Sequence, residues 1–381
     1  MTHKRRIIHG LIFQEQGEFV PGTVYLCNDR IVSEAAYQNT EGEESVTDAR
    51  DQYVIPGLTD IHFHGCMGSD CCDGTQEAFR TIAEYQLKQG VTSITPATMT
   101  MPEETLSEIC RAARDFDCPN GADFCGLYME GPFISPAKKG AQNESYIHPA
   151  DTAMLKRLQE ISGSKIRTVV IAPETEGAME FIQENRDTIN ISLAHTTADY
   201  DTARKALSLG ASQLTHMYNA MPPFSHRAPG PIGAAAEDKH CMAELICDGV
   251  HIHPSVVRAS LQLFGDDRII FISDSMRAAG MEDGTYDLGG QAVTVTGNLA
   301  VLSDGTIAGS ATNLMECMRT AVLKMDIPLA SAVKCAAVNP VKAIGLWEDY
   351  GSLTPGKYAN IVILNKDLGL ETVFHRGTPI G

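Results

Sequence analysis

The sequence predicts an α/β fold, a (β/α)8 barrel (TIM barrel) with a small β-sandwich domain built from both chain termini. Two observations predict it. Between residues 53 and 276 there are eight apolar, β-rich runs, and helical patterns separate most of them. Near-continuous apolar strands that alternate with helices are typical of a parallel sheet, and eight such units are typical of a barrel. At both ends of the chain, short runs alternate apolar and polar residues, which indicates antiparallel strands.

The barrel strands are predicted where apolar, β-rich residues follow one another without a break. These runs are Tyr53–His64, Val91–Thr98, Cys125–Phe133, Arg167–Glu174, Asn190–Thr197, Ala211–Ala220, Ala243–Ile252 and Ile269–Met276. The clearest helical patterns between them are Gln76–Gln89, Glu103–Phe116 and Asp199–Leu209. Pro102 precedes the second of these, and Gly90 and Gly210 follow the first and third, as expected at helix starts and ends.

Neither β-rich end of the chain should be stable alone, so we expect the two ends to form one domain. Its predicted strands lie within Arg6–Phe13, Thr23–Ser33, Ala359–Leu364 and Thr372–His375. We place this domain at residues 1–54 plus 353–381 and the barrel at residues 55–352. A β-hairpin insert is predicted near residues 285–309, with turns at Gly289-Gly290 and Asp304-Gly305.

The composition is that of a globular protein that does not bind nucleic acid or membranes. The chain has 381 residues, 43% of them hydrophobic, and a formal net charge of −18. It has no apolar run of the roughly 18 residues that cross a bilayer, and an acidic surface repels nucleic acid. Its eleven cysteines, with Cys66, Cys71 and Cys72 clustered, are odd in number and irregularly spaced, which indicates free thiols. Because no signal-peptide pattern occurs, we expect a cytoplasmic protein.

Polar residues stand at the ends of six of the eight predicted strands. In chain order these are His62 and His64, Glu130, His195, His216, Asp248 with His251, and Asp274. Barrel enzymes carry their chemistry at the carboxyl ends of the strands, so we expect these side chains to lie close together.

Glu130, His195 and His216 predict a metal site, because a carboxylate and two imidazoles suit Zn²⁺ or Fe²⁺ and leave a coordination position for water. Each residue also has an ordinary alternative, since single buried histidines are usually hydrogen-bonded core residues and a buried glutamate can form an ion pair. His62 and His64 are two residues apart and face one side of their strand, which predicts half of a metal site. The alternative is a hydrogen-bonded histidine pair.

Asp274 and Arg227 predict proton transfer and phosphate binding. Asp274 can accept a proton from water and return it to a leaving amine, although a helix N-cap is its alternative role. Arg227 lies in the loop after the sixth strand and can bind a phosphate bidentately, although a solvated loop arginine is the alternative. An acidic chain needs such a local positive charge to bind an anionic substrate.

These motifs together resemble the amidohydrolase superfamily. The segment Pro56-Gly57-Leu58-x-Asp60-x-His62-x-His64-Gly65 is similar to its entry motif. Within the superfamily, the chain resembles the N-acetylglucosamine-6-phosphate deacetylases through Glu130-Gly131-Pro132-Phe133, the stretch from His216 to Gly230, Asp248-Gly249-Val250-His251, and Asp274. The resemblance covers essentially the whole chain, and its most specific part is the loop from Asn219 to Gly230.

The resemblance implies hydrolysis of the N-acetyl group of an amino-sugar 6-phosphate in amino-sugar catabolism. It implies that Glu130, His195 and His216 hold the main metal and that Asp274 is general base and then general acid. One or two divalent ions are implied, Zn or Fe first, with Mn, Co or Ni as alternatives. A homodimer is implied, because in the family part of the loop with Arg227 can reach a neighbouring subunit. The residues implied to contact substrate are Ala141, Gln142, Asn219, Ala220, Arg227, His251, Ala308, Gly309 and Ser310.

Gln142 stands where some members of the family carry a histidine that polarises the acetyl carbonyl. A glutamine cannot carry charge, and a second metal at His62 and His64 would make up for this. Three alternatives stay open: a deacetylase of N-acetylgalactosamine 6-phosphate, another amidohydrolase that acts on a small amide, and a non-catalytic barrel. Among the amidohydrolases, cyclic-amide hydrolases are disfavoured, because no lysine stands at a strand end to bridge two metals.

Overall fold

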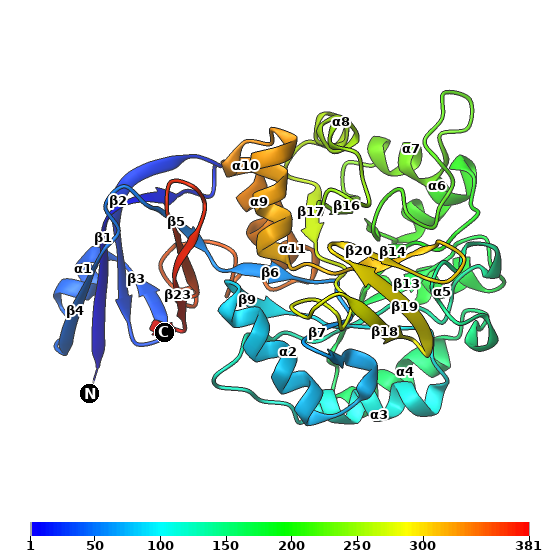
Figure 1. Cartoon of the computed structure of the whole chain (residues 1–381), viewed down its shortest axis with the longest axis horizontal. Coiled ribbons are helices and arrows are strands. Elements are labelled where there is room, and N and C mark those ends of the chain that lie inside the picture. The colour runs from blue at the N-terminus through cyan, green and yellow to red at the C-terminus, as the bar shows by residue number, and fades with distance from the viewer. Residues whose placement is uncertain (1, 381) are drawn as a thin grey trace.

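The computed structural model describes residues 2–380 and confirms the predicted barrel with a β-rich domain beside it (Figure 1). Eight parallel strands follow one another around the barrel, and two of them are each interrupted into two pieces. The backbone N–H of Asp274 donates to the His62 carbonyl (3.0 Å), which joins the last strand to the first. The strands are β6 (Leu58–Asp60), β9 with β10 (Val91–Ile94, Ala97–Thr98), β11 with β12 (Asp123–Phe124, Leu127–Met129), β13 (Ile166–Ile171), β14 (Asn190–Leu193), β15 (Gln213–Leu214), β16 (Met242–Ile246) and β17 (Ile269–Ile272).

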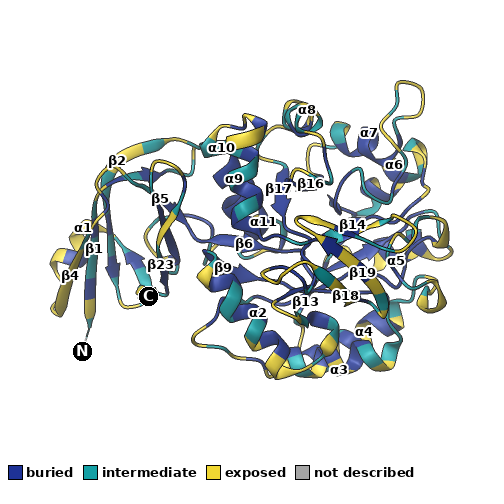
Figure 2. Cartoon of the chain, viewed as in Figure 1, coloured by how far each residue is buried: buried dark blue, intermediate teal, exposed yellow. Residues whose placement is uncertain are grey.

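Helices surround the barrel and bury one face each against it (Figure 2). The three helices predicted from sequence are α2, α3 and α6, and the Thr75 and Asp199 side chains cap the first and the last of them. The helices are α2 (Gln76–Lys88), α3 (Glu103–Arg114), α4 (Thr152–Ser162), α5 (Ala178–Asn185), α6 (Tyr200–Leu209), α7 (Gly230–Glu237), α8 (Pro254–Phe264), α9 (Leu314–Met325), α10 (Leu329–Val333) and α11 (Asn339–Ala343), with short turns η1 (Cys71–Asp73), η2 (Pro136–Lys138), η3 (Glu144–Tyr146) and a π-helical η4 (Lys334–Val338).

The two chain ends form one β-rich domain, as predicted, with its own apolar core. Its strands are β1 (His3–Phe13), β2 (Phe19–Cys27), β3 (Arg30–Val32), β4 (Glu43–Asp48), β5 (Tyr53–Pro56), β22 (Ile361–Leu364), β23 (Leu370–His375) and β24 (Thr378–Ile380), with helix α1 (Glu34–Gln38) between β3 and β4. In β22, Ile361 and Ile363 face the core of this domain, whereas Val362 and Leu364 face the core of the barrel. β22 therefore packs on both parts of the molecule. The domain limits given above stay a prediction.

The insert after the last barrel strand is larger than the predicted hairpin. Residues 284–310 form four antiparallel strands, β18 (Gly284–Leu288), β19 (Gln291–Thr296), β20 (Leu299–Val301) and β21 (Ile307–Ser310). The sequence interpretation missed the turn at Gly297, which has a φ of 57° that favours glycine. Apolar side chains of the insert pack on Met99 and Met276, so the insert covers one side of the barrel mouth. A small hairpin, β7 (Gly65–Cys66) with β8 (Ser69–Asp70), follows the first barrel strand.

All eleven cysteines are free, as expected from their spacing. Within residues 2–380, no helix has the length and apolar character needed to span a membrane.

A buried ion-pair cluster joins the barrel to the terminal domain. Asp123 Oδ1 accepts hydrogen bonds from His375 Nε2 (3.1 Å) and Arg376 Nε (2.8 Å), and Oδ2 accepts one from Asn360 (2.9 Å). Burial alone would raise the pKa of Asp123, but His375 and Arg376 hold it below its usual range. We expect Asp123→Asn, which removes the charge and leaves these donors with a poorer acceptor, to lower the free energy of unfolding by about 1–3 kcal/mol.

The effect of Asp123→Asn should depend on pH. A carboxyl group whose folded pKa is lowered contributes stability above its unfolded pKa near 3.8, and this stability is lost as pH falls through the folded pKa. The difference in apparent Tm between wild type and variant should therefore be full at neutral pH and shrink below about pH 4. Thermal unfolding across this range measures it, and a difference that does not change with pH would contradict the assignment.

Candidate active site

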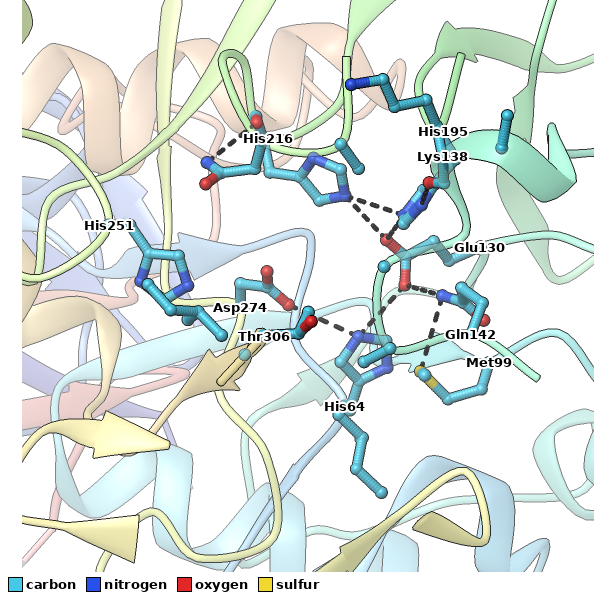
Figure 3. Close-up of a pocket in the computed structure, with 18 residues that line it drawn as sticks. His64, Met99, Glu130, Lys138, Gln142, His195, His216, His251, Asp274 and Thr306 are labelled. Carbon is cyan, nitrogen blue, oxygen red and sulfur yellow. Dashed lines mark hydrogen bonds and ion pairs between the residues drawn. The ribbon is translucent and has the colours of Figure 1, made fainter. Parts of the chain in front are cut away.

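One cavity of about 380 Å³ lies at the carboxyl ends of the barrel strands. His64, Glu130, His195, His216 and Asp274 all face it, although they come from five different strands (Figure 3). His62 is fully buried directly behind this group. The structure thus brings together residues that are up to 212 positions apart in the sequence (62 to 274).

Glu130, His195 and His216 place three ligand atoms in a small triangle. Glu130 Oε1 lies 3.1 Å from His195 Nε2 and 2.9 Å from His216 Nε2, and the two Nε2 atoms are 3.2 Å apart. Ligand atoms bound to a tetrahedral Zn²⁺ at about 2.0–2.1 Å lie roughly 3.3 Å from one another. The triangle therefore fits one divalent ion with a further position free for water or substrate.

Two imidazole rings each contact a backbone carbonyl on the side that faces away from Glu130. This contact decides which ring nitrogen is left to face Glu130. His195 Nδ1 lies 2.9 Å from the Lys138 carbonyl, which can only accept, so Nδ1 carries a proton and Nε2 is the nitrogen that faces Glu130. His64 Nδ1 faces the Ala97 carbonyl (3.2 Å) in the same way. An imidazole nitrogen that faces a carboxylate either carries a proton or binds a cation, so this donor set can hold a divalent ion when the inner nitrogens are unprotonated.

A second cluster adjoins the first across Glu130 (Figure 3). His64 Nε2 is 3.2 Å from Glu130 Oε2 and 3.4 Å from Asp274 Oδ1. His62 Nε2 lies 3.6 Å from Glu130 Oε1 and 3.9 Å from Asp274 Oδ1. His62, His64 and Asp274 each offer a ligand atom within 4.8 Å of the others. Glu130 therefore lies between two sets of ligands.

Unusual backbone conformations direct three of these side chains. His195, His216 and Asp274 have φ values of 45°, 30° and 47°, and each is the second residue beyond the end of its strand, β14, β15 or β17. This left-handed region is unfavourable for residues with a Cβ, and such strain gathers at functional sites. The positions of the strand ends determine how far along the barrel axis the three residues lie, and the strained turns direct their side chains toward the cavity.

The histidines keep both carboxyl groups of the site ionised. Burial alone would raise the pKa of each, but His62, His195 and His216 hold the pKa of Glu130 well below its usual range, and His64 and His62 lower that of Asp274. Burial alone would lower the pKa of His64, yet Asp274 and Glu130 raise it to about 10. Two adjacent carboxylates in a buried site attract a cation.

Six of the nine predicted substrate residues line the cavity, namely Ala141, Gln142, Asn219, Ala220, His251 and Gly309. Arg227, Ala308 and Ser310 do not. Ala308 lies in the core of the insert, and Ser310 Oγ donates to the Ser273 carbonyl, because neighbours of Gly309 on a strand face the other way. Arg227 is exposed on the loop before α7, which extends away from the barrel (Figure 1).

Hydrogen bonds hold two of the residues that do line the cavity. Gln142 Nε2 donates to Glu130 Oε2 (2.8 Å), and its Oε1 accepts from the backbone N–H of Thr100 (2.6 Å). His251 Nδ1 pairs with Asp248 Oδ2 (2.7 Å). Burial alone would lower the pKa of His251, but this carboxylate raises it. Gln142 is thus turned toward Glu130, and His251 is favoured as a cation at the cavity wall.

Sequence reasoning missed several residues that surround the site. Met99, Leu288 and Ile307 form an apolar part of the cavity wall, and Lys138 also lines it. No local pattern marks these residues, since they meet only in the folded chain. Glu244 had a signal that was not used: like Glu130, it is a glutamate inside an apolar run.

The chain is similar over nearly its whole length to one protein family and to several known proteins. The pattern of the Amidohydrolase family matches residues 53–380. N-acetylglucosamine-6-phosphate deacetylase of Bacillus subtilis (strain 168) is 37% identical over 333 residues, 86% of this chain and 84% of that protein. N-acetylgalactosamine-6-phosphate deacetylase of Escherichia coli O157:H7 is 33% identical over 336 residues, 87% of this chain and 89% of that protein. The crystal structure of N-acetylglucosamine-6-phosphate deacetylase from Pasteurella multocida superposes with a TM-score of 0.91 at 26% identity, covering 100% of both chains.

Proposed function

This chain belongs to the amidohydrolase family, and from that premise we propose that it hydrolyses N-acetylglucosamine 6-phosphate to glucosamine 6-phosphate and acetate. The observation that carries the proposal is the triangle of Glu130, His195 and His216 beside Asp274. A ligand set for a divalent ion, next to a carboxylate that can move protons, is what hydrolysis of an amide needs. The names of its relatives supply the substrate class, an N-acetylated amino-sugar 6-phosphate.

We assign the main ion to Glu130, His195 and His216, and a second ion to His62 and His64 beside Asp274, with Glu130 between the two. These donors suit Zn²⁺ or Fe²⁺, with Mn²⁺, Co²⁺ or Ni²⁺ as alternatives. When bound, such an ion polarises the acetyl carbonyl and lowers the pKa of water beside it. The neutral Gln142 side chain bonds to Glu130 and brings no positive charge to the substrate.

Asp274 is assigned the proton transfers. Its carboxylate faces the cavity and stays ionised, because His64 and His62 outweigh its burial and lower its pKa. As a base it accepts a proton from the attacking water, and as an acid it returns a proton to the amine that leaves. Both steps occur at one carboxylate within reach of the same cavity.

His251 is assigned to the sugar or its phosphate. Its raised pKa favours the imidazolium form, which suits an anion. Asn219 and Ala220 line the same cavity from the loop after β15 and offer amide and backbone contacts. Gly309 supplies a wall without a side chain, which leaves room for the sugar ring.

Arg227 is assigned to the cavity of a second subunit in a homodimer. Within its own chain the residue is exposed and absent from the cavity wall, although an acidic protein needs a cation for a phosphorylated substrate. Its loop also exposes Phe224, which is 49% accessible, as expected of a segment that meets a partner. We place the homodimer in a reducing cytoplasm, which suits eleven free thiols.

Acetate release from a panel of sugars tests the function directly. N-acetylglucosamine 6-phosphate should release acetate much faster than N-acetylglucosamine, because the phosphate contacts contribute binding energy. Equal rates with and without phosphate would contradict the assigned phosphate contacts, and no release from any sugar would contradict the deacetylase function. N-acetylgalactosamine 6-phosphate belongs in the panel as the second candidate substrate, since one relative is named for it.

Mixing two impaired variants tests the assignment of Arg227 to a partner's cavity. Arg227→Ala should raise KM for the phosphorylated substrate by about 10-fold or more, because a charged hydrogen bond contributes about 1.5–3 kcal/mol. Asp274→Asn should be nearly inactive. A mixed dimer contains one site with Asp274 from one chain and Arg227 from the other, so mixing should restore activity at low substrate concentration. Rates that only average on mixing would contradict a shared site.

A further inference from the structure

Glu244 is a buried carboxylate inside the barrel that no step of the reaction uses. It lies on β16, is 0% exposed and does not line the cavity. Its Oε2 accepts hydrogen bonds from His62 Nδ1 (2.9 Å) and the backbone N–H of His216 (3.1 Å). Its Oε1 accepts from the Tyr128 hydroxyl (2.9 Å) and from Gln213 Nε2. All four neighbours donate, so both oxygens of Glu244 act as acceptors.

This contact decides which nitrogen of His62 is free. With a proton of His62 on Nδ1 and directed to Glu244, Nε2 is the nitrogen that can bind a metal, and it is a buried atom with no hydrogen-bond partner within residues 2–380. Nε2 points between Glu130 Oε1 (3.6 Å) and Asp274 Oδ1 (3.9 Å). The Tyr128 ring stacks on the imidazole at 4.3 Å between centroids, which fixes the ring plane. A buried imidazole nitrogen aimed between two carboxylates is well placed to bind a metal ion.

The same oxygen of Glu244, Oε2, also contacts a residue of the main ligand set. Glu244 Oε2 holds the backbone N–H of His216, whose φ of 30° is strained. One carboxylate oxygen therefore supports the ring of His62 in one cluster and the backbone of His216 in the other. Burying a carboxyl group in a barrel core is costly unless hydrogen bonds compensate it, as the four donors around Glu244 do.

We propose that Glu244 is a positioning residue for the second ion: it holds His62 in the Nδ1–H form, so that Nε2 can bind a metal beside His64 and Asp274. The proposal rests on the two-ion site proposed above and deepens it. Groups that orient a metal-bound histidine commonly change metal affinity by about 10–100-fold when they are replaced.

Metal titration of the whole protein tests the proposal without measuring activity. Zn²⁺ is added to metal-stripped protein in a calorimeter, and bound ions are counted by elemental analysis after dialysis. Wild type should bind two ions per chain. Glu244→Gln keeps the size of the side chain and removes its charge, so its second Zn²⁺ should bind about 10–100-fold more weakly while the first stays bound.

Tyr128→Phe is the matched control for the buried network. It removes the hydroxyl that donates to Glu244 Oε1, but it keeps the ring that stacks on His62 and leaves the bond from Oε2 to His62 intact. This variant should therefore bind two ions as wild type does. If it loses the second ion as strongly as Glu244→Gln, the network is merely structural and the proposal is wrong.

A measurement on the wild type covers the case in which Glu244→Gln does not fold. In Zn²⁺-loaded protein labelled with ¹⁵N-histidine, His62 should show a low-field proton on Nδ1, and this resonance should be missing in His62→Gln. A proton on Nε2 instead, or two tightly bound ions in a folded Glu244→Gln variant, overturns the proposal. Wild type that binds a single ion overturns it as well. Two ions without acetate release would refute the proposed function and leave this inference standing.

Discussion

Replacing Asp274 by asparagine should lower kcat for acetate release by about 10²–10⁴-fold, with little change in KM. Asparagine keeps the shape of the side chain but cannot take up a proton at neutral pH. In the wild type, His64 and His62 hold the pKa of Asp274 below its usual range despite its burial, so the carboxylate is ready to act as a base. Steady-state kinetics with N-acetylglucosamine 6-phosphate measure the effect.

Asp304→Asn is the matched control for this experiment. Asp304 is an exposed turn residue of the insert and does not line the cavity, so the same exchange there should leave kcat unchanged. Bound metal is counted in Asp274→Asn, because Asp274 also belongs to the second cluster. A variant that keeps kcat within a few-fold of wild type would exclude Asp274 as the proton carrier.

Replacing Glu130 by glutamine should remove both bound ions together with the activity. Glu130 Oε1 faces His195 and His216, and its Oε2 faces His64, so one side chain serves both ligand sets. A bound ion supplies several kcal/mol of transition-state stabilisation, so acetate release should fall by at least about 10³-fold. Elemental analysis of the purified variant and its acetate-release rate are the two measurements.

Glu174→Gln controls for the loss of a carboxylate near the same end of the barrel. Glu174 ends the predicted fourth run, but its carboxylate binds Thr197 and the Thr196 hydroxyl outside the cavity. This variant should retain its metal and most of its activity. Glu130→Gln that still holds two ions per chain would contradict the bridging position of Glu130.

Much of the barrel could be predicted because its signals are local. A strand buried on both faces appears in the sequence as an apolar run. A helix between strands appears as apolar residues that recur with a period of 3.6 residues, with capping residues at its ends. A few neighbouring residues mark the helix starts at Thr75 and Asp199 and the helix ends at Gly90 and Gly210. The missed turn at Gly297 also had a local signal, and it changed a hairpin into four strands.

The end of the barrel at which the site lies could be predicted for the same reason. His195, His216 and Asp274 each follow an apolar run, and parallel strands end at one side of a barrel, so these residues had to lie at one level. What could not be predicted was direction. Ala308 and Ser310 flank Gly309 in sequence yet face away from the cavity, because successive residues of a strand point to opposite sides.

The sequence by itself determined the number and order of the barrel strands, the β-rich character of both ends and the residue types at the strand ends. Only the tertiary structure decided which atoms meet. Closing the barrel brings His62 of the first strand beside Asp274 of the last and over Glu244 of the seventh, and it leaves Arg227 exposed on its loop. The reason is physical: strand formation depends on near neighbours in the chain, whereas a metal site depends on ångström distances between side chains that only the closed barrel places together.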